Sequence, residues 1–381
     1  MGDFFSILLS AIIVAGLVFS LVALVLTRAA AARAAEPLRI ADTPVTILKP
    51  LCGAEPALAA NLQALLEHGH AAPVQIIFGV SDARDPALLA VEAARRTHPD
   101  ADIMVVVDNM RHGASAKMSN VINMARHIRH PLIVLADSDV AAPAGTIGSL
   151  CAALADPSVG VVSCLHAGRG DAGLWSRLAA MDISYRYMPS VLVGHGLGLA
   201  HPVLGPMMAL RSETLASIGG FSPFADVLAD DYEIGRAVRR LGLSLTIAPR
   251  FVIHGCSEAG AMALVRHELR WSRTIYGIDP AGFAGSLVTH VLANAMILVA
   301  LVGVSGWTMT LLVAALLVRC TLKLAIDRAS GTSSGPMILL PVRDLMSLLL
   351  FLATFFVGTV DWRGSRFKLT SDGRLLPERQ I

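Results

Sequence analysis

The sequence predicts an α/β protein whose mostly parallel sheet carries helices on both faces and whose two ends are membrane helices. Three observations lead to this class. Short runs of Val, Ile and Leu alternate with helical stretches between about residues 43 and 256. An uncharged apolar run lies near the N-terminus, and a longer one lies near the C-terminus. Regular alternation of strands and helices implies a parallel sheet with right-handed crossovers.

The composition excludes a wholly soluble protein. Of 381 residues, 54% are hydrophobic and 16% are charged, and the mean hydropathy is +0.62. Soluble domains average about 45–50% apolar and about 25% charged residues. A net charge of +2 argues against a dedicated nucleic-acid-binding protein. The five scattered cysteines form no CxxC pair, which indicates reduced thiols and neither a disulfide framework nor a zinc site.

The N-terminal run, residues 4–27, contains no charged residue and exceeds the roughly 20 residues that a span needs. A cleaved signal peptide is the alternative, but Asp3 precedes the run without any Lys or Arg, and the run is longer than the usual apolar core of about 7–15 residues. Arg28, Arg33 and Arg39 follow it, so the positive-inside rule places the next segment in the cytoplasm. We therefore expect an anchor at 1–27 and a linker at 28–43.

The C-terminal membrane region is expected at 281–360, followed by a basic tail at 361–381. Residues 281–318 lack Asp, Glu, Lys and Arg, and a Gly-Val-Ser-Gly stretch at 303–306 divides them into a predicted hairpin of two spans. The last apolar run, 345–360, is short, and is tilted, re-entrant or extended back through Pro341. Basic residues flank it on both sides, so charge leaves the side of the C-terminus open.

The soluble domain is expected at 44–256. Its strands are nearly continuous Val, Ile and Leu, as is typical of strands buried on both faces. The uncharged stretch 188–210 holds three prolines and two histidines, which predicts loop and strand instead of a span. The predicted strands are 45–48, 74–80, 103–107 and 132–136, and the predicted helices are 57–68, 86–97, 116–129 and 144–155.

Carboxylates follow two of these strands, at the sheet edge where such folds bind ligands. Asp82 follows the second strand, and Asp137 and Asp139 follow the fourth. Two carboxylates two positions apart can present oxygens to one hard cation, Mg²⁺ or Mn²⁺, together with a diphosphate. An Asp in this position can also simply cap a helix or turn the chain. The presence of Asp82 at the matching edge favours the binding site.

Three further charges are candidates for the same chemistry. Lys117 opens a helix after a glycine-bearing loop, where it could meet a diphosphate or remain a solvated surface lysine. Asp230 and Asp231 open another helix, where acids are common for dipole reasons alone. Adjacent carboxylates could also supply a general base. The sequence holds no GxGxxG or Walker A motif.

A basic helix is expected at 257–280. Arg266, Arg270 and Arg273 share one face by their spacing, and Trp271 lies beside them. Such a helix either touches anionic lipid at the membrane interface or clamps a leaving diphosphate.

Taken together, these motifs resemble membrane-bound, family 2-like glycosyltransferases of the GT-A (nucleotide-diphospho-sugar transferase) fold, in the ceramide glucosyltransferase group. Within that group the sequence is most similar to the bacterial hopanoid-biosynthesis-associated glycosyltransferases, on the stretches 174–178, 189–194, 267–271 and 279–282. The broader resemblance is carried by residues 45–51, Ser81-Asp82, Lys117 with Asn120, Asp137-Ser138-Asp139, residues 219–221, residues 229–232 and Arg270-Trp271.

The resemblance implies a role for each acidic motif. Asp82 would contact the uracil or ribose of a UDP-sugar. Asp137 and Asp139 would hold the metal and diphosphate, with Asp139 as the more direct ligand. Asp231 would be the base that removes the proton of the acceptor hydroxyl, beside Asp230.

It also implies that Arg270 and Trp271 match a (Q/R)xxRW element that lies over the diphosphate and acceptor. His267 stands where that element has Gln or Arg, and we expect it among the substrate-binding residues. Arg266 cannot replace it, since neighbouring residues point about 100° apart on a helix.

The expected function is inverting transfer of a sugar, N-acetylglucosamine, from a UDP-sugar to a hydroxyl of a membrane lipid, a hopanoid polyol. A ceramide glucosyltransferase using UDP-glucose is the second expectation, and a non-catalytic UDP-sugar-binding membrane subunit is the rival from another class. A transporter is disfavoured because His290 is the one ionisable residue in the predicted spans. The expected location is the bacterial inner membrane, multi-pass, with the catalytic domain in the cytoplasm.

Overall fold

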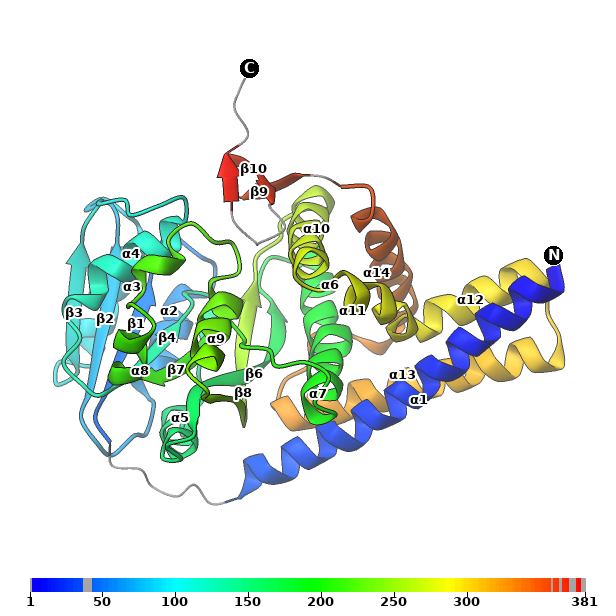
Figure 1. The fold of residues 1–381 in the computed structure, drawn as a ribbon, viewed down its shortest axis with the longest axis horizontal. Helices are drawn as coiled ribbons and strands as arrows, with labels where there is room; N and C mark the ends of the chain where they lie inside the picture. The colour runs from blue at the N-terminus through cyan, green and yellow to red at the C-terminus, as the bar shows by residue number, and fades with distance from the viewer. Residues whose placement is uncertain (1, 37–42, 358, 363–364, 370–374, 378–381) are drawn as a thin grey trace. The chain divides into compact units, whose positions relative to one another are not determined.

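The computed structural model describes residues 2–36, 43–357, 359–362, 365–369 and 375–377. They form two compact units, coloured along the chain in Figure 1. We call residues 33–167 and 201–257 the sheet unit, and residues 1–32, 168–200 and 258–381 the helical unit.

The sheet unit is built on one eight-stranded sheet in the order β3-β2-β1-β4-β7-β6-β8-β5. β1 pairs in parallel with β2 and β4, and β2 with β3, whereas β7 pairs antiparallel with β4 and β6. The predicted α/β GT-A-like class, a mostly parallel mixed sheet, is confirmed. The strands are β1 (Val45–Pro50), β2 (Val74–Val80), β3 (Asp102–Val107), β4 (Leu132–Ala136), β5 (Val140–Ala141), β6 (Val159–Gly170), β7 (Met207–Arg211) and β8 (Ser244–Cys256).

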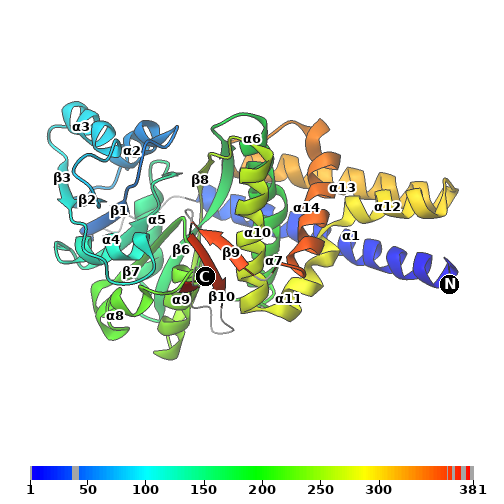
Figure 2. The ribbon, with the colours of Figure 1, turned by 90° about the horizontal axis from the view of Figure 1, so that it is seen from above.

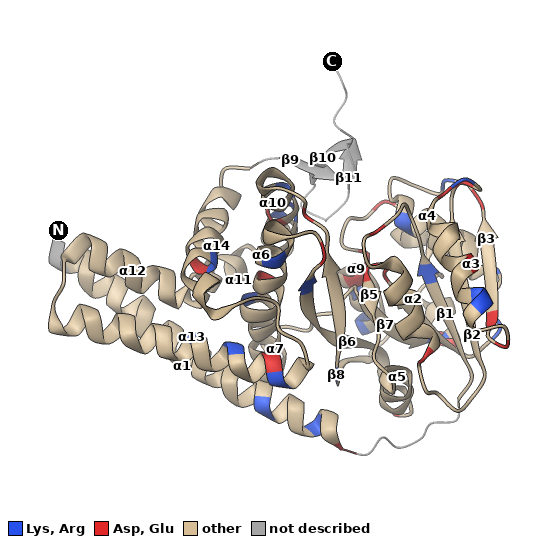
Figure 3. Ribbon diagram, turned by 180° about the vertical axis from the view of Figure 1, so that it is seen from behind, with Lys and Arg blue, Asp and Glu red and all other residues tan. Residues whose placement is uncertain are grey.

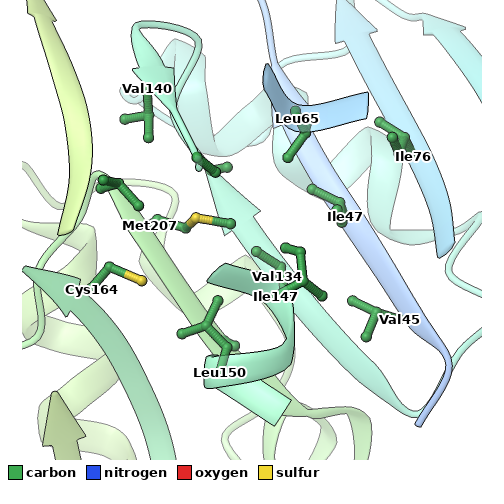
Figure 4. Packing of buried hydrophobic residues seen from close by; sticks show 14 of the residues in the cluster. Val45, Ile47, Leu65, Ile76, Val134, Val140, Ile147, Leu150, Cys164 and Met207 are labelled. Atoms are coloured by element: carbon green, nitrogen blue, oxygen red, sulfur yellow. The ribbon is translucent and has the colours of Figure 1, made fainter. Parts of the chain in front are cut away.

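Helices cover both faces of this sheet, as Figure 2 shows. Successive residues of a strand point to opposite faces, so Ile47 packs in one core cluster and Leu48 in the other. The Ile47 cluster, seen in Figure 4, lies under α2, α3 and α5, and the Leu48 cluster lies under α4, α8 and α9. The helices are α2 (Leu58–Leu66), α3 (Ala87–Thr97), α4 (Ala116–Ala125), α5 (Thr146–Leu154), α8 (Ser212–Ser217), η2 (Ser222–Phe224) and α9 (Asp230–Arg240).

Among the described residues, three helices of the helical unit are long and apolar enough to cross a membrane: Phe4–Ala35, Gly306–Ser330 and Met337–Thr354. Figure 3 shows α12 and the adjoining stretches of α1 and α13 free of charged residues. Its elements are α1 (Gly2–Ala35), α6 (Leu174–Asp182), η1 (Ile183–Tyr187), α7 (Met188–Gly196), α10 (Ala261–Ile278), α11 (Pro280–Gly285), η3 (Ser286–Thr289), α12 (Val291–Val302), α13 (Gly306–Ser330), η4 (Met337–Leu339), α14 (Leu340–Thr354) and an antiparallel sheet of β9 (Thr359–Trp362), β10 (Ser365–Leu369) and β11 (Leu375–Pro377).

One membrane expectation needs correction, and an alternative left open is now decided. The first arm of the predicted hairpin is no straight span, because Pro280–Thr289 and Val291–Val302 meet at a 66° bend. The last apolar helix does extend back through Pro341, since α14 begins at Leu340. The chain turns between α12 and α13 at Gly303, whose φ of 92° is readily adopted only by glycine.

The stretch 188–210, expected as loop and strand, begins instead with the helix α7. Pro189 lacks the N–H that would bond to the carbonyl four residues earlier, that of Tyr185. A π-helical turn, η1, lies at this point, and the Arg319 guanidinium donates to the Tyr185 carbonyl oxygen. A residue from a distant helix therefore satisfies the group that the proline leaves open, and the helix continues.

Candidate active site

Lys117 joins two of the predicted acidic motifs. Ser115 caps α4 by accepting a hydrogen bond from the Met118 N–H, which fixes the helix start just before Lys117. The Lys117 Nζ lies 2.8 Å from Asp137 Oδ1 and 3.2 Å from Asp230 Oδ2, and its side chain is 21% exposed. Lys117 is thus held by two carboxylates and is not a solvated surface lysine.

His254 contacts the second carboxylate after β4, Asp139, with its Nε2 3.3 Å from Asp139 Oδ2. The contact follows from pairing, because β5 places Val140 opposite His254 of β8 and the Gly255 N–H donates to the Asp139 carbonyl oxygen at 2.8 Å. His254 was not among the residues predicted from sequence. His254 lies two residues before the end of β8 at Cys256 and belongs to no motif, and only the register of β5 against β8 brings it to Asp139.

Lys49 is a second residue to which no sequence motif gives a role. It is buried in β1, and its Nζ donates to the carbonyl oxygens of Asp137 at 2.6 Å and Val140 at 3.0 Å. Burial lowers the pKa of Lys49 to about 8, against the opposing effect of Asp139 and Asp137. Lys49 therefore braces the backbone turn that presents the two aspartates.

Asp231 is the carboxyl with the chemistry of a base. Its Oδ1 accepts the Tyr232 N–H at 2.8 Å, and its other oxygen faces Gly205, where an added Cβ would come within 2.8 Å. Removal from water, and then the charge of Asp230, raises the pKa of Asp231 to about 7. A carboxylate with a pKa near 7 accepts a proton more strongly than an ordinary aspartate.

The two aspartates after β4 differ in their electrostatics. Burial, partly offset by Lys117, raises the pKa of Asp137. Burial also acts to raise the pKa of Asp139, but the charge and hydrogen bond of His254, helped by Lys49, outweigh it and lower that pKa to about 2. Asp139 is therefore an anion at any physiological pH.

The contacts of Asp82 are with Arg84 and not with the aspartates and lysines described above. Asp82 sits after β2, as predicted, but its side chain is 51% exposed and pairs with Arg84 at 3.2 Å. The hydrogen bonds from Arg84 lower the pKa of Asp82. At the same strand end, Asn120 donates to the Gly79 carbonyl oxygen at 2.8 Å. A side chain at Gly79 would collide with Asn120, so this glycine permits the close approach of α4.

The remaining predicted residues lie on α10 in the helical unit. His267 Nδ1 contacts Glu258, and its ring meets Trp271 edge-on at 5.1 Å. Trp271 also lies 5.9 Å from the Tyr187 ring. In the structure His267 thus orients Trp271, while Arg270 lies one position before it on the same helix.

The acidic cluster fits a divalent cation whose coordination is completed by substrate. Within the described residues no group of three or more His, Cys, Asp or Glu side chains converges as a metal cage. Asp139 Oδ1 is nevertheless buried, and in the described part of the chain it receives no hydrogen bond. Mg²⁺ is commonly held by one or two carboxylates plus substrate phosphates, which matches Asp137 and Asp139.

Residues 8–375 match the model of glycosyl transferase family 21. The chain belongs to this family. It is 18% identical over 340 residues to ceramide glucosyltransferase 1 of Caenorhabditis elegans, covering 87% of this chain and 72% of that protein. It is 20% identical over 344 residues to ceramide glucosyltransferase 3 of the same organism, covering 88% and 74%. The protein is therefore a glycosyltransferase distantly related to ceramide glucosyltransferases.

Two solved structures are similar at a lower level. One is the mannosyltransferase PcManGT from Pyrobaculum calidifontis in complex with GDP-Man and Mn²⁺, at 20% identity and a TM-score of 0.46, covering 91% of this chain and 98% of that one. The other is GalNAc-T7 with UDP, GalNAc and Mn²⁺, at 12% identity and a TM-score of 0.42, covering 62% and 51%.

Proposed function

We propose that this glycosyltransferase moves a sugar from a UDP-sugar to a hydroxyl of a membrane lipid, with inversion at the anomeric carbon. The observation that carries the proposal is the cluster of Lys117, Asp137 and Asp230 beside Asp231. It combines a cation for a diphosphate, carboxylates for a metal and a base with a pKa near 7.

In the proposed reaction, Asp231 takes the proton of the acceptor hydroxyl. The hydroxyl oxygen bonds to the anomeric carbon from the face opposite the nucleotide, and the bond from that carbon to the diphosphate oxygen breaks. UDP leaves with the electron pair. Lys117 opposes the negative charge that develops on the diphosphate, an effect that often contributes most to such catalysis. The resemblance of Arg270-Trp271 to the RW element is the reason for proposing the same role for Arg270.

The other site residues are proposed to contact either the cation or the donor. Asp137 and Asp139 would hold Mg²⁺ or Mn²⁺, which supplies Lewis-acid stabilisation of the leaving diphosphate. Asp82 is proposed to contact the uridine and would exchange its partner Arg84 for the ligand. Trp271, held by His267, is proposed to contact donor or acceptor.

A lipid acceptor is supported by the candidate spans, because they hold the enzyme in the bilayer where an apolar acceptor resides. The resemblance of residues 189–194 and 267–271 to hopanoid-associated enzymes favours a hopanoid polyol and UDP-N-acetylglucosamine. Ceramide and UDP-glucose come second. Arg28, just after the first apolar run, supports a cytoplasmic catalytic domain on the bacterial inner membrane.

The test is transfer of radiolabelled sugar by the purified protein in liposomes. UDP-N-acetylglucosamine and UDP-glucose are each offered with a hopanoid polyol or with ceramide, and the lipid extract is separated by chromatography. We expect labelled lipid with one donor–acceptor pair. A protein that binds UDP but labels no lipid from any pair is the non-catalytic subunit, and the proposal is then wrong.

A further inference from the structure

The loop after α7 exposes two leucines. Leu197 is 57% exposed and Leu199 is 76% exposed, and Gly198 between them has a φ of 68°. Single exposed apolar side chains are ordinary on a protein surface. Two in one short loop need a further observation before they indicate a partner.

That observation is the place of the loop along α1. The last residue of α7, Gly196, lies so close to α1 that an added Cβ would be 3.0 Å from Leu26 Cδ1. Leu26 lies one residue before the end of the uncharged part of α1, since Thr27 is followed by Arg28. The change from apolar to basic residues marks where a span leaves the hydrocarbon. Figure 1 shows α7 approaching α1 near this end of the helix.

The loop also meets the main requirement for entering an apolar medium, because its backbone donors are satisfied internally. The Leu197 N–H donates to Val193 O at 3.0 Å, and the Gly198 N–H donates to His195 O at 3.1 Å. The Leu199 and Ala200 N–H groups both donate to Gly194 O, at 2.8 and 2.9 Å.

The lack of charged residues in this segment also favours contact with lipid. No Asp, Glu, Lys or Arg occurs from residue 188 to residue 200, so the loop carries no charged group that would have to be dehydrated, and His195 is the one titratable side chain of α7. An exposed leucine of the sheet unit lacks this setting. Leu89 is equally exposed, at 76%, but it lies on α3, a helix that carries Glu92, Arg95 and Arg96.

We propose that residues 197–200 insert Leu197 and Leu199 into the bilayer leaflet in which α1 ends. The partner is the lipid surface itself. Burial of the two leucines in the acyl boundary removes apolar area from water. The loop adds an interfacial contact to the candidate spans and holds the end of α7 at the depth of the headgroups.

The experiment places an environment-sensitive fluorophore on single cysteines of the full chain in liposomes. The background carries Cys52→Ser and Cys320→Ser, because the other three cysteines are buried. Leu199→Cys is the test and Leu89→Cys is the matched control of equal exposure. Val18→Cys, 56% exposed on α1, is the control within a span.

Lipids carrying nitroxide near the headgroup are expected to quench the probe at position 199 several-fold more than the probe at position 89. Nitroxide deep in the acyl chain should quench position 18 more than position 199. Equal quenching at 199 and 89, with position 18 quenched, overturns the proposal. Failure to quench position 18 overturns it as well, because the span that sets the loop's depth is then wrong. None of these outcomes depends on the transfer reaction.

Discussion

The two units of this protein both gather charged side chains away from water, but they do so in opposite ways. In the helical unit, the carboxylates buried between helices, Asp182 and Asp344, are each paired with an arginine. Arg319 donates to both oxygens of Asp344, at 2.8 and 2.7 Å, and both side chains are 4% exposed. In the sheet unit, Asp137, Asp139, Asp230 and Asp231 gather with fewer positive charges.

The helical unit balances its second cluster just as closely. Asp182 accepts from Arg186 at 2.7 Å, from Arg343 at 2.8 Å and from Ser347 at 2.7 Å. Arg343 also donates to Glu268 at 2.5 Å, so two guanidinium groups meet two carboxylates. A buried charge pair of this kind is costly to break by removing one partner.

In the sheet unit, the clustered carboxylates outnumber the basic side chains around them. Its four aspartates face Lys117, Lys49 and His254, and Asp139 Oδ1 accepts no hydrogen bond from any described residue. Paired charges therefore join helices, whereas unbalanced carboxylates indicate a site that takes a cation and a substrate.

The expectation that His290 is the one ionisable residue of the spans was wrong. Arg319 and Arg343 lie within them, and their pairing assigns them to packing instead of transport.

The largest expected effect is a loss of activity that follows from changing the sheet unit and not from changing the helical unit. Asp231→Asn should lower kcat by about 10²–10⁴-fold, the usual contribution of a general base, while UDP binding by calorimetry is unchanged. Asp344→Asn is the matched control in the helical unit. It should lower the unfolding temperature and leave the rate per folded molecule intact. Retained turnover in Asp231→Asn would remove this residue from the role of base.

Breaking the balance of the helical unit should cost stability. Arg343→Met leaves Glu268 buried without its base, and we expect a loss of about 3–5 kcal/mol in the free energy of unfolding. Arg129→Met, which removes the exposed pair with Asp102, should cost no more than about 1 kcal/mol. Thermal unfolding in detergent measures both. Similar losses for the two variants would contradict the assignment of the helical cluster to packing.

Removing the divalent cation tests whether the aspartates of the sheet unit form a metal site. Chelation should stop transfer, and Mn²⁺ or Mg²⁺ should restore it. Asp139→Asn should weaken Mn²⁺ binding, followed by electron paramagnetic resonance, by at least about 10–100-fold, the loss seen when even outer-shell partners of a metal are changed. An unchanged Mn²⁺ affinity in this variant would show that Asp139 is no ligand.

The smallest expected effect is on the pH profile. Because the pKa of Asp231 is raised to about 7, its carboxyl is protonated below that pH and cannot accept the acceptor proton. The rate should fall about tenfold for each pH unit below 7. Asp230→Asn removes the neighbouring charge that raises this pKa and should move the acid limb to lower pH. An acid limb that stays in place would assign it to another group.

Much of the sheet unit follows from local sequence. β2 and β4 occupy the predicted ranges, because uninterrupted Val, Ile and Leu are stable only where both faces of a strand are covered. The places of Asp82 and Asp137 after these strands follow at once. Helix ends were less well predicted, and α4 stops at Ala125 where 129 was expected.

Tertiary structure alone decided the partners of these residues. His254 reaches Asp139, and Lys49 reaches the turn after β4, through strand pairing between segments far apart in the chain. The Tyr185 carbonyl, four residues before Pro189, accepts from Arg319 of another helix, a contact that no local sequence pattern predicts. Apolar patterns and strand ends depend on neighbours in sequence, so the sequence determines them. Charge balance depends on which distant side chains meet, and folding determines that.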